Sequence, residues 1–563
     1  MNRMKLTGAQ IIVEQLCRHG VEVLFGYPGG AVLPIYDELY KNADRLRHVI
    51  TAHEQGASHA ADGYARVSGK VGVVLATSGP GATNLVTGIA NAYLDSVPLV
   101  AITGNVAVPL LGKDSFQEVN IQGITMPVVK HSFALRSAAE LESALDQAFQ
   151  IASSGRPGPV LIDVPKSVQT ELAEYPAGGT EYPMPDIPEI SEADLEKLLH
   201  ILQKSERPFI YAGGGILAAG AEKELEALAQ KLASPVGFSM MGLTAMSCNH
   251  PLNLGMCGMH GKYAANMAQE KSDLILALGV RFSDRATGDV QAYRANRVIV
   301  HVDIDGAELG KNVSGDLMIR GDVREILRKL LQKLPQCSHS AWLEEVETWQ
   351  KAIQNLPVPE NTLTPQRLIR MIAQTCTPET VIATDVGQHQ MWTVQNYPFR
   401  QTRKLLTSGG LGTMGYGRGA AMGGCIANGR KRTVLFTGDG SFGMNLNELA
   451  TAVRENLPLL VVIFHNGVLG MERQWQTLFY HKHYSQTTLS QHTDFVKLAE
   501  AFGAVGMRVQ SVSELQEILH HLPEEGPVVL DCRIGQDEFV LPMIPPGGTA
   551  GDMMTRKPEE LEK

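Results

Sequence analysis

The stretch Thr433-Val434-Leu435-Phe436-Thr437-Gly438-Asp439-Gly440-Ser441, "TVLFTGDGS", places one carboxylate between two glycines at the end of an apolar run. It is followed by "MNLNELATAVRENL" (444–457), whose apolar residues recur at helical spacing, and by the apolar run "PLLVVIF" (458–464), which leads into "HNG". A strand, a helix and a second strand in this order predict one βαβ unit with parallel strands. Because such crossovers are right-handed, Asp439 and Asn466 are expected at the same edge of the sheet.

An aspartate and an asparagine at one sheet edge predict a site for a metal ion and a diphosphate. Open α/β sheets bind their ligands at this edge. A carboxylate oxygen and an amide oxygen, with backbone carbonyls nearby, suit Mg²⁺, which keeps part of its shell for water and phosphate oxygens. Gly438 and Gly440 would let the backbone approach the diphosphate closely. Either residue alone would be better interpreted as a turn, and only the pair favours the site.

The same alternation of apolar runs and amphipathic segments extends through the whole chain. Continuous apolar runs separated by helical stretches indicate strands buried on both faces, hence parallel sheets covered by helices. The predicted strands include residues 71–76, 98–102, 160–164, 274–278, 298–302, 381–383, 458–464 and 528–531. The fold class is therefore predicted as α/β, with three doubly wound parallel-sheet domains.

Two stretches rich in proline, glycine and polar residues, Glu174–Ile190 and Asn355–Gln366, are interpreted as linkers between these domains. We predict an N-terminal domain at residues 1–173, a middle domain at 191–354, a C-terminal domain at 363–545 and a tail at 546–563.

Composition narrows the class of protein. The 563 residues are 44% hydrophobic and 19% charged, which is typical of soluble globular chains. The net charge of −10 lacks the basic footprint of a nucleic-acid-binding protein. Near the start, Thr7-Gly8-Ala9-Gln10 predicts a capped helix rather than a signal peptide, and no apolar run has the length of a membrane span. Seven scattered cysteines without a Cys-x-x-Cys pair indicate reduced thiols in a cytoplasmic protein.

The segment Gly438-Asp439-Gly440, followed after a helix and a strand by Asn466, resembles the metal and diphosphate motif of thiamine diphosphate enzymes. The resemblance implies thiamine diphosphate and Mg²⁺ as cofactors. It also implies Asp439, Asn466 and the carbonyl of Val468 as metal ligands, with Gly440 and Ser441 beside the diphosphate. His465 stands where the family usually has an asparagine.

The segment "TAHEQGASHAADGYAR" (51–66) offers Glu54 directly before a run of small residues. A solvated glutamate at a helix start is the simpler interpretation of this residue alone. The segment resembles the His-Glu-x-x-Ala segment of the family, and this implies that Glu54 is the acid-base catalyst that acts on the pyrimidine ring.

Two further segments resemble cofactor-binding parts of the same family. In "SGGLGTMGYG" (408–417) the resemblance implies that Gly412 and Met414 hold the pyrimidine, and in "DVGQHQMW" (385–392) that Gln388 and His389 lie by the diphosphate. On composition alone, Met414 would be core packing and His389 an ordinary histidine.

Over nearly the whole chain, the resemblance is strongest to the acetohydroxyacid synthases, also called acetolactate synthases. It implies a transferase that decarboxylates pyruvate and joins the remaining two-carbon unit to a second pyruvate or to 2-oxobutanoate. The products are 2-acetolactate and 2-aceto-2-hydroxybutyrate, formed in the first common step of branched-chain amino acid biosynthesis. The segment "GMERQWQ" (470–476) implies Met471 and Trp475 as substrate residues, and "DSFQE" (114–118) implies Phe116 and Gln117.

The middle domain resembles the FAD-binding domain of that family. The glycine turn in "YAGGGI" (211–216) is a weak signal alone, and "GMCGMHG" (255–261), "GVRFSDR" (279–285) and "HVDID" (301–305) strengthen it. The resemblance implies a flavin with a structural role, and Arg281 would also suit a substrate carboxylate. The implied flavin residues are Arg156, Gly213, Gly214, Gly215, Met259, His260, Arg281, Arg285, Asp303 and Asp322.

Three departures from the family pattern stand beside these matches. Arg418-Gly419 replaces the usual Leu-Pro, which puts a cation where the helix dipole disfavours one. Ser283 replaces an aspartate and Asn105 replaces a glutamine.

The departures keep a second function open, a non-catalytic cofactor-binding paralogue, and a pyruvate oxidase that reduces its flavin is a third. The expected partners are 2-oxoacids, a second copy of the chain in a homodimer or homotetramer, and a small regulatory subunit that is common in the family.

Overall fold

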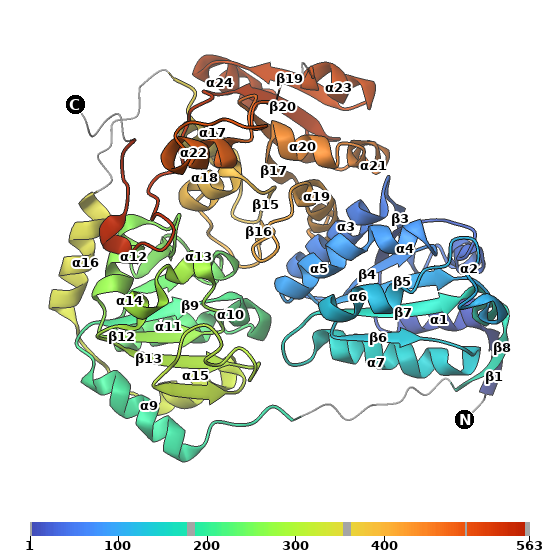
Figure 1. Ribbon diagram of the computed structural model, residues 1–563, viewed down its shortest axis with the longest axis horizontal. Helices are drawn as coiled ribbons and strands as arrows, with labels where there is room; N and C mark the ends of the chain where they lie inside the picture. The colour runs from blue at the N-terminus through green and yellow to red at the C-terminus, as the bar shows by residue number, and fades with distance from the viewer. Residues whose placement is uncertain (1–2, 177–185, 353–361, 490–492, 558–563) are drawn as a thin grey trace.

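Three six-stranded parallel sheets, one in each third of the chain, organise the computed structural model (Figure 1). The structure describes residues 3–176, 186–352, 362–489 and 493–557. The N-terminal domain (blue) and the middle domain (green) lie side by side, and the C-terminal domain (orange) lies above them in this view. The predicted α/β class with three parallel-sheet domains is confirmed.

The N-terminal domain is built on the sheet β3-β2-β4-β5-β7-β6. Its strands are β2 Val23–Tyr27, β3 Arg47–Ile50, β4 Gly72–Ala76, β5 Leu99–Asn105, β6 His131–Ala134 and β7 Pro159–Pro165. Its helices are α1 Gly8–Arg18, α2 Leu33–Lys41, α3 Glu54–Ser68, α4 Pro80–Asn84, α5 Val86–Leu94, α6 Ile121–Thr125, α7 Leu141–Ser153 and α8 Lys166–Thr170.

The middle domain is built on the sheet β11-β10-β9-β12-β13-β14. Its strands are β9 Pro208–Ala212, β10 Val236–Phe238, β11 Asn253–Met256, β12 Leu274–Leu278, β13 Val298–Asp303 and β14 Leu317–Arg320. Its helices are α9 Glu192–Lys204, α10 Gly214–Ala219, α11 Glu222–Leu232, α12 Tyr263–Lys271, α13 Asp284–Thr287, α14 Val290–Arg294, α15 Val323–Lys333 and α16 Ser340–Ala352.

The C-terminal domain is built on the sheet β16-β15-β17-β18-β20-β19. Its strands are β15 Val381–Thr384, β16 Leu405–Leu406, β17 Thr433–Gly438, β18 Leu459–His465, β19 Val505–Val509 and β20 Val528–Arg533. Its helices are α17 Pro365–Gln374, α18 Gln388–Asn396, α19 Tyr416–Ala427, α20 Asp439–Met444, α21 Glu448–Arg454, α22 Gly470–Phe479, α23 Phe495–Ala501 and α24 Val512–His520.

Strand order separates the middle domain from the other two. Counted along the chain within each sheet, the first and third sheets both have the order 2-1-3-4-6-5, and the middle sheet has the order 3-2-1-4-5-6. The latter is the order of dinucleotide-binding doubly wound folds. In both orders the ligand crevice is expected where neighbouring strands lead their helices to opposite faces of the sheet.

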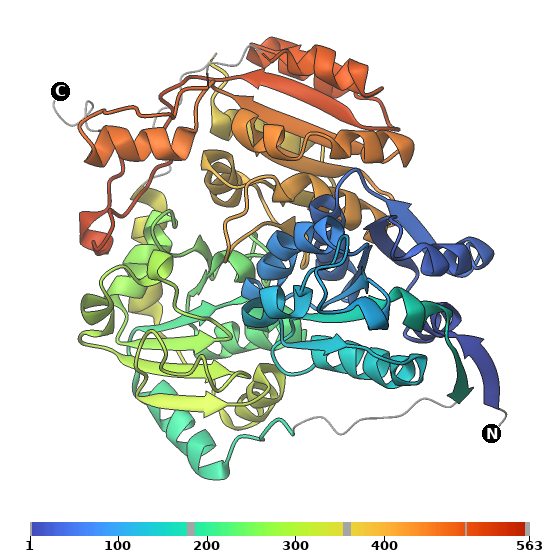
Figure 2. The same ribbon diagram turned by 45° about the vertical axis from the view of Figure 1, so that its right-hand side comes forward.

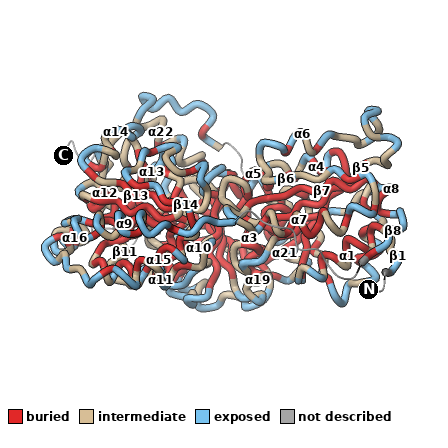
Figure 3. The backbone as a smooth tube through the Cα atoms, turned by 90° about the horizontal axis from the view of Figure 1, so that it is seen from below, coloured by how far each residue is buried: buried red, intermediate tan, exposed pale blue. Residues whose placement is uncertain are grey.

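Both faces of these sheets are buried, as the continuous apolar runs predict. In β4, Val73 and Leu75 belong to one hydrophobic cluster, while Val74 and Ala76 belong to another on the opposite face. Figure 3 shows the result as buried backbone along the strands, with exposed segments around them.

Two sequence-based expectations need correction. The predicted linker at Glu174 begins in a strand, because β8 (Leu172–Pro176) pairs antiparallel with β1 (Arg3–Thr7). Residues 177–185 and 353–361 of the two linkers lie outside the described residues. The linker predicted to end at Gln366 already contains the start of α17, which Thr364 caps by accepting a hydrogen bond from the Arg367 backbone N–H. The domain limits remain a prediction.

The single helix predicted after Asp439 is two helices, α20 and α21. The side chain of Asn445 donates to the Gly415 carbonyl, and the Arg418 guanidinium donates to the carbonyls of Asn445 and Leu446. In a continuous helix the carbonyls of Asn445 and Leu446 would accept bonds within the helix, and the Asn445 side chain would point outward. Here these groups bond to other parts of the domain, and the helix is interrupted at this turn. The Thr7–Gln10 capping box at the start of α1 is confirmed.

The N-terminal and C-terminal domains are joined through close packing of α3 against α19 (Figures 1 and 2). A Cβ atom on Gly423 would lie 1.8 Å from the Ala60 carbonyl oxygen, and one on Gly63 would lie 2.2 Å from that of Ala420. Glycine at these positions is what lets the two backbones approach. Among the residues described, no helix has both the length and the apolar character for crossing a bilayer.

Candidate active site

A cavity of about 650 Å³ lies between the C-terminal and middle domains. Its C-terminal wall comes from the segments that follow β15, β17 and β18, which are neighbouring parallel strands. The structure thus brings Asp439 and Asn466 to one edge of the sheet, where both line the cavity. This is the arrangement that the βαβ pattern predicts.

Asp439 is almost fully buried beside the cavity. Its Oδ2 atom accepts a hydrogen bond of 2.7 Å from the Gly467 backbone N–H, and its Oδ1 atom accepts one of 2.9 Å from the Gly440 N–H. Burial raises the pKa of Asp439 above its usual value, while these backbone bonds favour the charged form. The Asn466 side-chain oxygen accepts a bond of 3.1 Å from the Val468 N–H, which fixes the orientation of the amide.

Three buried polar atoms of cavity-lining residues have no hydrogen-bond partner among the described residues: His389 Nε2, Gln388 Oε1 and His260 Nδ1. Burial lowers the pKa of His389 to about 3 and that of His260 to about 4, so both rings are neutral at physiological pH. The Gln388 amide nitrogen is held by Gln474 Oε1 at 2.9 Å and by the Glu538 carbonyl at 2.7 Å. Unpaired buried polar atoms are rare, and here they indicate a polar ligand.

The loop Ser408–Thr413 and Met414 form the part of the wall that lies between β16 and α19. Gly412 has φ of +72°, a conformation that favours glycine, and both Gly412 and Met414 line the cavity. A Cβ on Gly440 would lie 3.8 Å from the terminal methyl of Met414. The Met414 side chain therefore reaches toward the turn that carries Asp439 and Ser441.

The opposite wall comes from the middle domain and from α22. Met259, His260, Ser283 and Arg285 line it. The Arg285 guanidinium lies over the Trp475 ring, 5.6 Å from the ring centre, and Met471 lines the cavity one helical turn earlier. Trp475 is only partly buried, so a simple core role does not describe it.

The three predicted catalytic and substrate residues of the N-terminal domain lie outside this lining. Glu54 begins α3 and is 8% exposed, and its Oε2 atom accepts a bond of 2.9 Å from the Asn84 side chain. Phe116 is 88% exposed, and Gln117 follows it with φ of +59°. Within one chain, the structure does not bring these residues to the cavity.

The remaining predicted residues of the FAD set lie outside the lining as well, and most have an evident local role. A Cβ on Gly213 would lie 2.0 Å from the Gly279 carbonyl oxygen, so packing of the β9 and β12 ends accounts for this glycine. Asp322 caps α15, and Arg156 donates to Glu308 at 2.7 Å.

The other members of that set make local contacts. Gly215 packs on Gly279, and a Cβ on Gly214 would approach Met241. Asp303 accepts a hydrogen bond from the Asp305 N–H. A guanidinium nitrogen of Arg281 lies 3.2 Å from a Cβ built on Gly410.

Arg418 lies in the first turn of α19, and its side chain is buried, with backbone carbonyls as hydrogen-bond partners. Its guanidinium donates to the Leu446 carbonyl at 2.7 Å and lies over the Phe442 ring at 3.9 Å. Burial lowers its pKa to about 10, opposed by the carboxylates of Asp385 and Glu448. The guanidinium thus bonds carbonyls that follow α20.

The side chains of Asn105 and His465 also have partners. Asn105 donates to Asp163 at 2.6 Å between β5 and β7, and His465 Nδ1 lies 2.6 Å from Asp531. Ser283 precedes α13 on the cavity wall.

Sequence reasoning missed supporting residues of the site. Gln474 Oε1 bonds both Gln388 and the Val540 N–H, and the Asp95 carboxylate accepts bonds from the backbone of the loop that carries Gly412. Gln474 lies in the segment 470–476, but nothing in the sequence singles it out there, and the Asp95 bond to Gly409 spans 314 residues. The described residues contain no group of three histidine, cysteine or acidic side chains placed for a metal ion, so a cation at Asp439 needs amide, carbonyl and ligand oxygens.

Comparison with known proteins identifies the class. Models of the thiamine pyrophosphate enzymes match in all three domains: the N-terminal TPP binding domain at residues 6–124, the central domain at 195–330 and the C-terminal TPP binding domain at 385–532. The fold is that of a thiamine pyrophosphate enzyme.

Curated relatives narrow this class. The acetolactate synthase large subunit of Buchnera aphidicola subsp. Schizaphis graminum is 42% identical, over 98% of this chain and 99% of its own length. The acetolactate synthase of Arthrospira platensis is 44% identical over 98% of both chains, and the large subunit of Lactococcus lactis subsp. lactis is 42% identical over 98% of both. The chain therefore belongs to the acetolactate synthase large-subunit family.

Proposed function

We propose that the protein is the catalytic chain of an acetolactate synthase. It decarboxylates pyruvate and condenses the remaining two-carbon unit with a second pyruvate or with 2-oxobutanoate, giving 2-acetolactate or 2-aceto-2-hydroxybutyrate. The observation that carries the proposal is the cavity at the carboxyl edge of the third sheet, with Asp439 and Asn466 together and three unpaired polar atoms, in a chain 42–44% identical to acetolactate synthases.

The donor set fits thiamine diphosphate and Mg²⁺. Asp439, the Asn466 amide oxygen and the Val468 carbonyl are hard oxygen donors of the kind that Mg²⁺ prefers. Gly440, Ser441, Gln388 and His389 would hold the diphosphate, and Gly412 and Met414 the pyrimidine. When bound, the thiazolium ring supplies the nucleophilic carbon and the electron sink for decarboxylation.

Glu54 is the proposed proton-transferring group, supplied by a second subunit. Its carboxylate is buried and oriented by Asn84, yet lies outside the cavity of its own chain. A homodimer or a dimer of dimers would bring Glu54, Phe116 and Gln117 to the cavity of a partner. The relatives named as large subunits support a small regulatory subunit as a further partner.

The middle domain is proposed to hold FAD. Its strand order is that of dinucleotide-binding folds, and Met259, His260 and Arg285 face the same cavity, with His260 Nδ1 unpaired. Arg281, beside Gly410, would bind the flavin and a substrate carboxylate, while Met471 and Trp475 would shape the space for the second 2-oxoacid. The other predicted flavin residues lie outside the cavity lining, and the reaction needs no redox step.

The test is a product assay with pyruvate, thiamine diphosphate, Mg²⁺ and FAD. We expect acetolactate, with two pyruvate molecules consumed for each CO₂ released, and loss of activity when Mg²⁺ is chelated. Rapid bleaching of the flavin by pyruvate without oxygen would instead favour a pyruvate oxidase. A cofactor-loaded protein that forms no acetolactate would favour a non-catalytic paralogue.

A further inference from the structure

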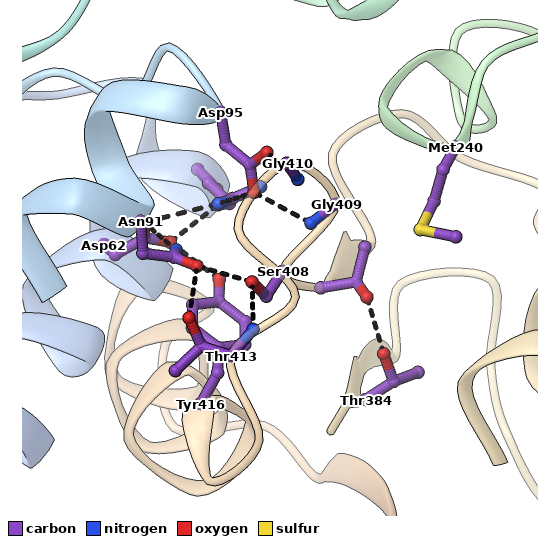
Figure 4. A network of polar contacts seen from close by, with 12 residues as sticks. Asp62, Asn91, Asp95, Met240, Thr384, Ser408, Gly409, Gly410, Thr413 and Tyr416 are labelled. Carbon is purple, nitrogen blue, oxygen red and sulfur yellow. Dashed lines mark hydrogen bonds and ion pairs between the residues drawn. The ribbon is translucent and has the colours of Figure 1, made fainter. Parts of the chain in front are cut away.

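The loop Ser408–Thr413 carries Gly412 and leads into Met414, yet it lacks regular backbone support. In the part of the chain that the structure describes, residues 408–412 make no backbone-to-backbone hydrogen bond. What holds the loop on one side is the N-terminal domain (Figure 4). The Asp95 carboxylate accepts the Gly410 N–H at 2.7 Å and the Gly409 N–H at 3.0 Å.

Asp95 is itself held in place by a buried charge cluster. It follows α5, and its Oδ2 atom also accepts a bond of 2.9 Å from Arg66, which in turn bonds Asp62 at 2.6 Å. The side chains of Asp62 and Asp95 are fully buried, and that of Arg66 is 10% exposed. Because two carboxylates share one guanidinium, the cluster depends on neutral donors, and the two loop N–H groups are among them.

A second contact fixes the other end of the loop. Asn91 accepts a bond of 2.6 Å from the Ser408 hydroxyl and donates at 3.1 Å to Asp62, and the Ser408 hydroxyl accepts the Thr413 N–H at 2.9 Å. The Tyr416 hydroxyl donates to Asp62 at 2.6 Å (Figure 4). The loop is thus attached to the same cluster before and after Gly412.

We propose that Asp95 is a positioning residue for thiamine diphosphate, because it fixes the backbone of the loop that presents Gly412 and Met414 to the cavity. The proposal rests on the proposed function only in taking thiamine diphosphate as the ligand of the cavity. Asp95 does not line the cavity itself, so it acts through the loop.

Gly410 offers an independent way to disturb the same contact. A Cβ on this residue would lie 3.0 Å from Asp95 Oδ1, 2.9 Å from Leu94 Cβ and 3.2 Å from a guanidinium nitrogen of Arg281. Gly410→Ala therefore pushes the loop away from Asp95 without changing the side chains of Asp62, Arg66 or Asp95. In Asp95→Asn both oxygens have donors to satisfy, so the new amide NH₂ must face at least one N–H group.

The experiment measures the affinity of the cofactor-free protein for thiamine diphosphate in saturating Mg²⁺, by fluorescence titration, beside steady-state kinetics. We expect each variant to lose affinity by about tenfold to hundredfold, the effect of a lost hydrogen bond to a charged group. At saturating cofactor, the KM of Asp95→Asn for pyruvate stays within about threefold, because this substitution leaves the proposed substrate groups untouched. Gly410→Ala is judged by cofactor affinity alone, because its methyl also approaches Arg281. The double variant loses less than the product of the two single effects, since both act on one contact.

The control is Asp273→Asn, which removes a comparable carboxylate that accepts the Ser205 hydroxyl and the Glu206 N–H in the middle domain, away from the cavity. We expect it to keep wild-type affinity. Unchanged affinity in both Asp95→Asn and Gly410→Ala, or an equal loss in Asp273→Asn, overturns the proposal while acetolactate formation by the wild type stands. A wild type that binds thiamine diphosphate without forming acetolactate overturns the function alone, and one that does not bind it overturns both.

Discussion

Hydrogen bonds to its side chain and to the backbone just before it fix the position of Glu54. Asn84 holds its carboxylate, and the Glu448 side chain accepts the N–H groups of Ala52 at 3.2 Å and His53 at 2.9 Å, directly before α3 begins. Glu448 is itself fully buried and accepts the Thr451 hydroxyl. A carboxylate fixed in this way can transfer a proton in one geometry, which is what acid-base catalysis requires.

Glu54→Gln should therefore lower turnover and leave cofactor binding intact. Glutamine keeps the shape and can still accept the Asn84 bond, but it cannot exchange the proton. We expect acetolactate formation to fall by about a hundredfold to ten-thousandfold, with thiamine diphosphate affinity close to that of the wild type.

Glu38→Gln is the matched control for this substitution, because Glu38 has the same exposure of 8% and pairs with Lys41 on α2. The Glu38→Gln variant should form acetolactate at the wild-type rate. If Glu54→Gln left the rate of acetolactate formation unchanged, the acid-base assignment would be wrong.

At the scale of single residues, the sequence predicts the position of a site residue where a local pattern, such as one βαβ unit, determines it. Asp439 and Asn466 belong to one βαβ unit, so their meeting follows from topology. Asp95 and Glu448 could not be found in this way, because each bonds backbone groups more than 300 residues away, and only the packing of two domains brings them together. Nor could the sequence identify the carbonyl partners of Arg418, because they follow a helix end that the sequence did not predict.

Among the elements, the packing of α3 against α19 ties the N-terminal domain to the wall of the cavity. Gly419 belongs to the same contact, since a Cβ there would lie 2.7 Å from the Gly56 carbonyl oxygen. The replacement of the usual proline by glycine thus meets a packing need that no helix-capping argument reveals. The sequence indicates helix starts near Glu54 and Arg418, and it could not predict that these two helices would touch.

Gly423→Ala should destabilise this contact. The added methyl would lie 1.8 Å from the Ala60 carbonyl oxygen, so the helices must separate. We expect the free energy of unfolding to fall by about 1–3 kcal/mol, as for overpacked cores, in urea denaturation of the dialysed protein.

Gly443→Ala provides the comparison for Gly423→Ala, because Gly443 is also helical but has open space around its Cβ position. It should be neutral or slightly stabilising, since alanine favours helix over glycine. Equal destabilisation by the two substitutions would contradict the account of α3 and α19.

For the whole molecule, composition and apolar runs sufficed to predict three parallel-sheet domains, because strands buried on both faces have a distinct pattern. Strand order within each sheet was not predictable, since it depends on which face each crossover helix covers. Nor could the sequence decide whether Glu54 meets the cavity of its own chain or of another. The structure leaves Glu54 outside the lining of its own cavity, and this supports a site shared between subunits.

The measurement that tests this account most directly mixes two inactive variants, Glu54→Gln and Asp439→Ala, under conditions that allow subunits to exchange. If each site takes Glu54 from one chain and Asp439 from the other, a mixed dimer contains one intact site. Acetolactate formation should then return to about a quarter of the wild-type rate after random exchange in a two-fold symmetric dimer. Confirmed exchange without any recovery of acetolactate formation would contradict the shared site.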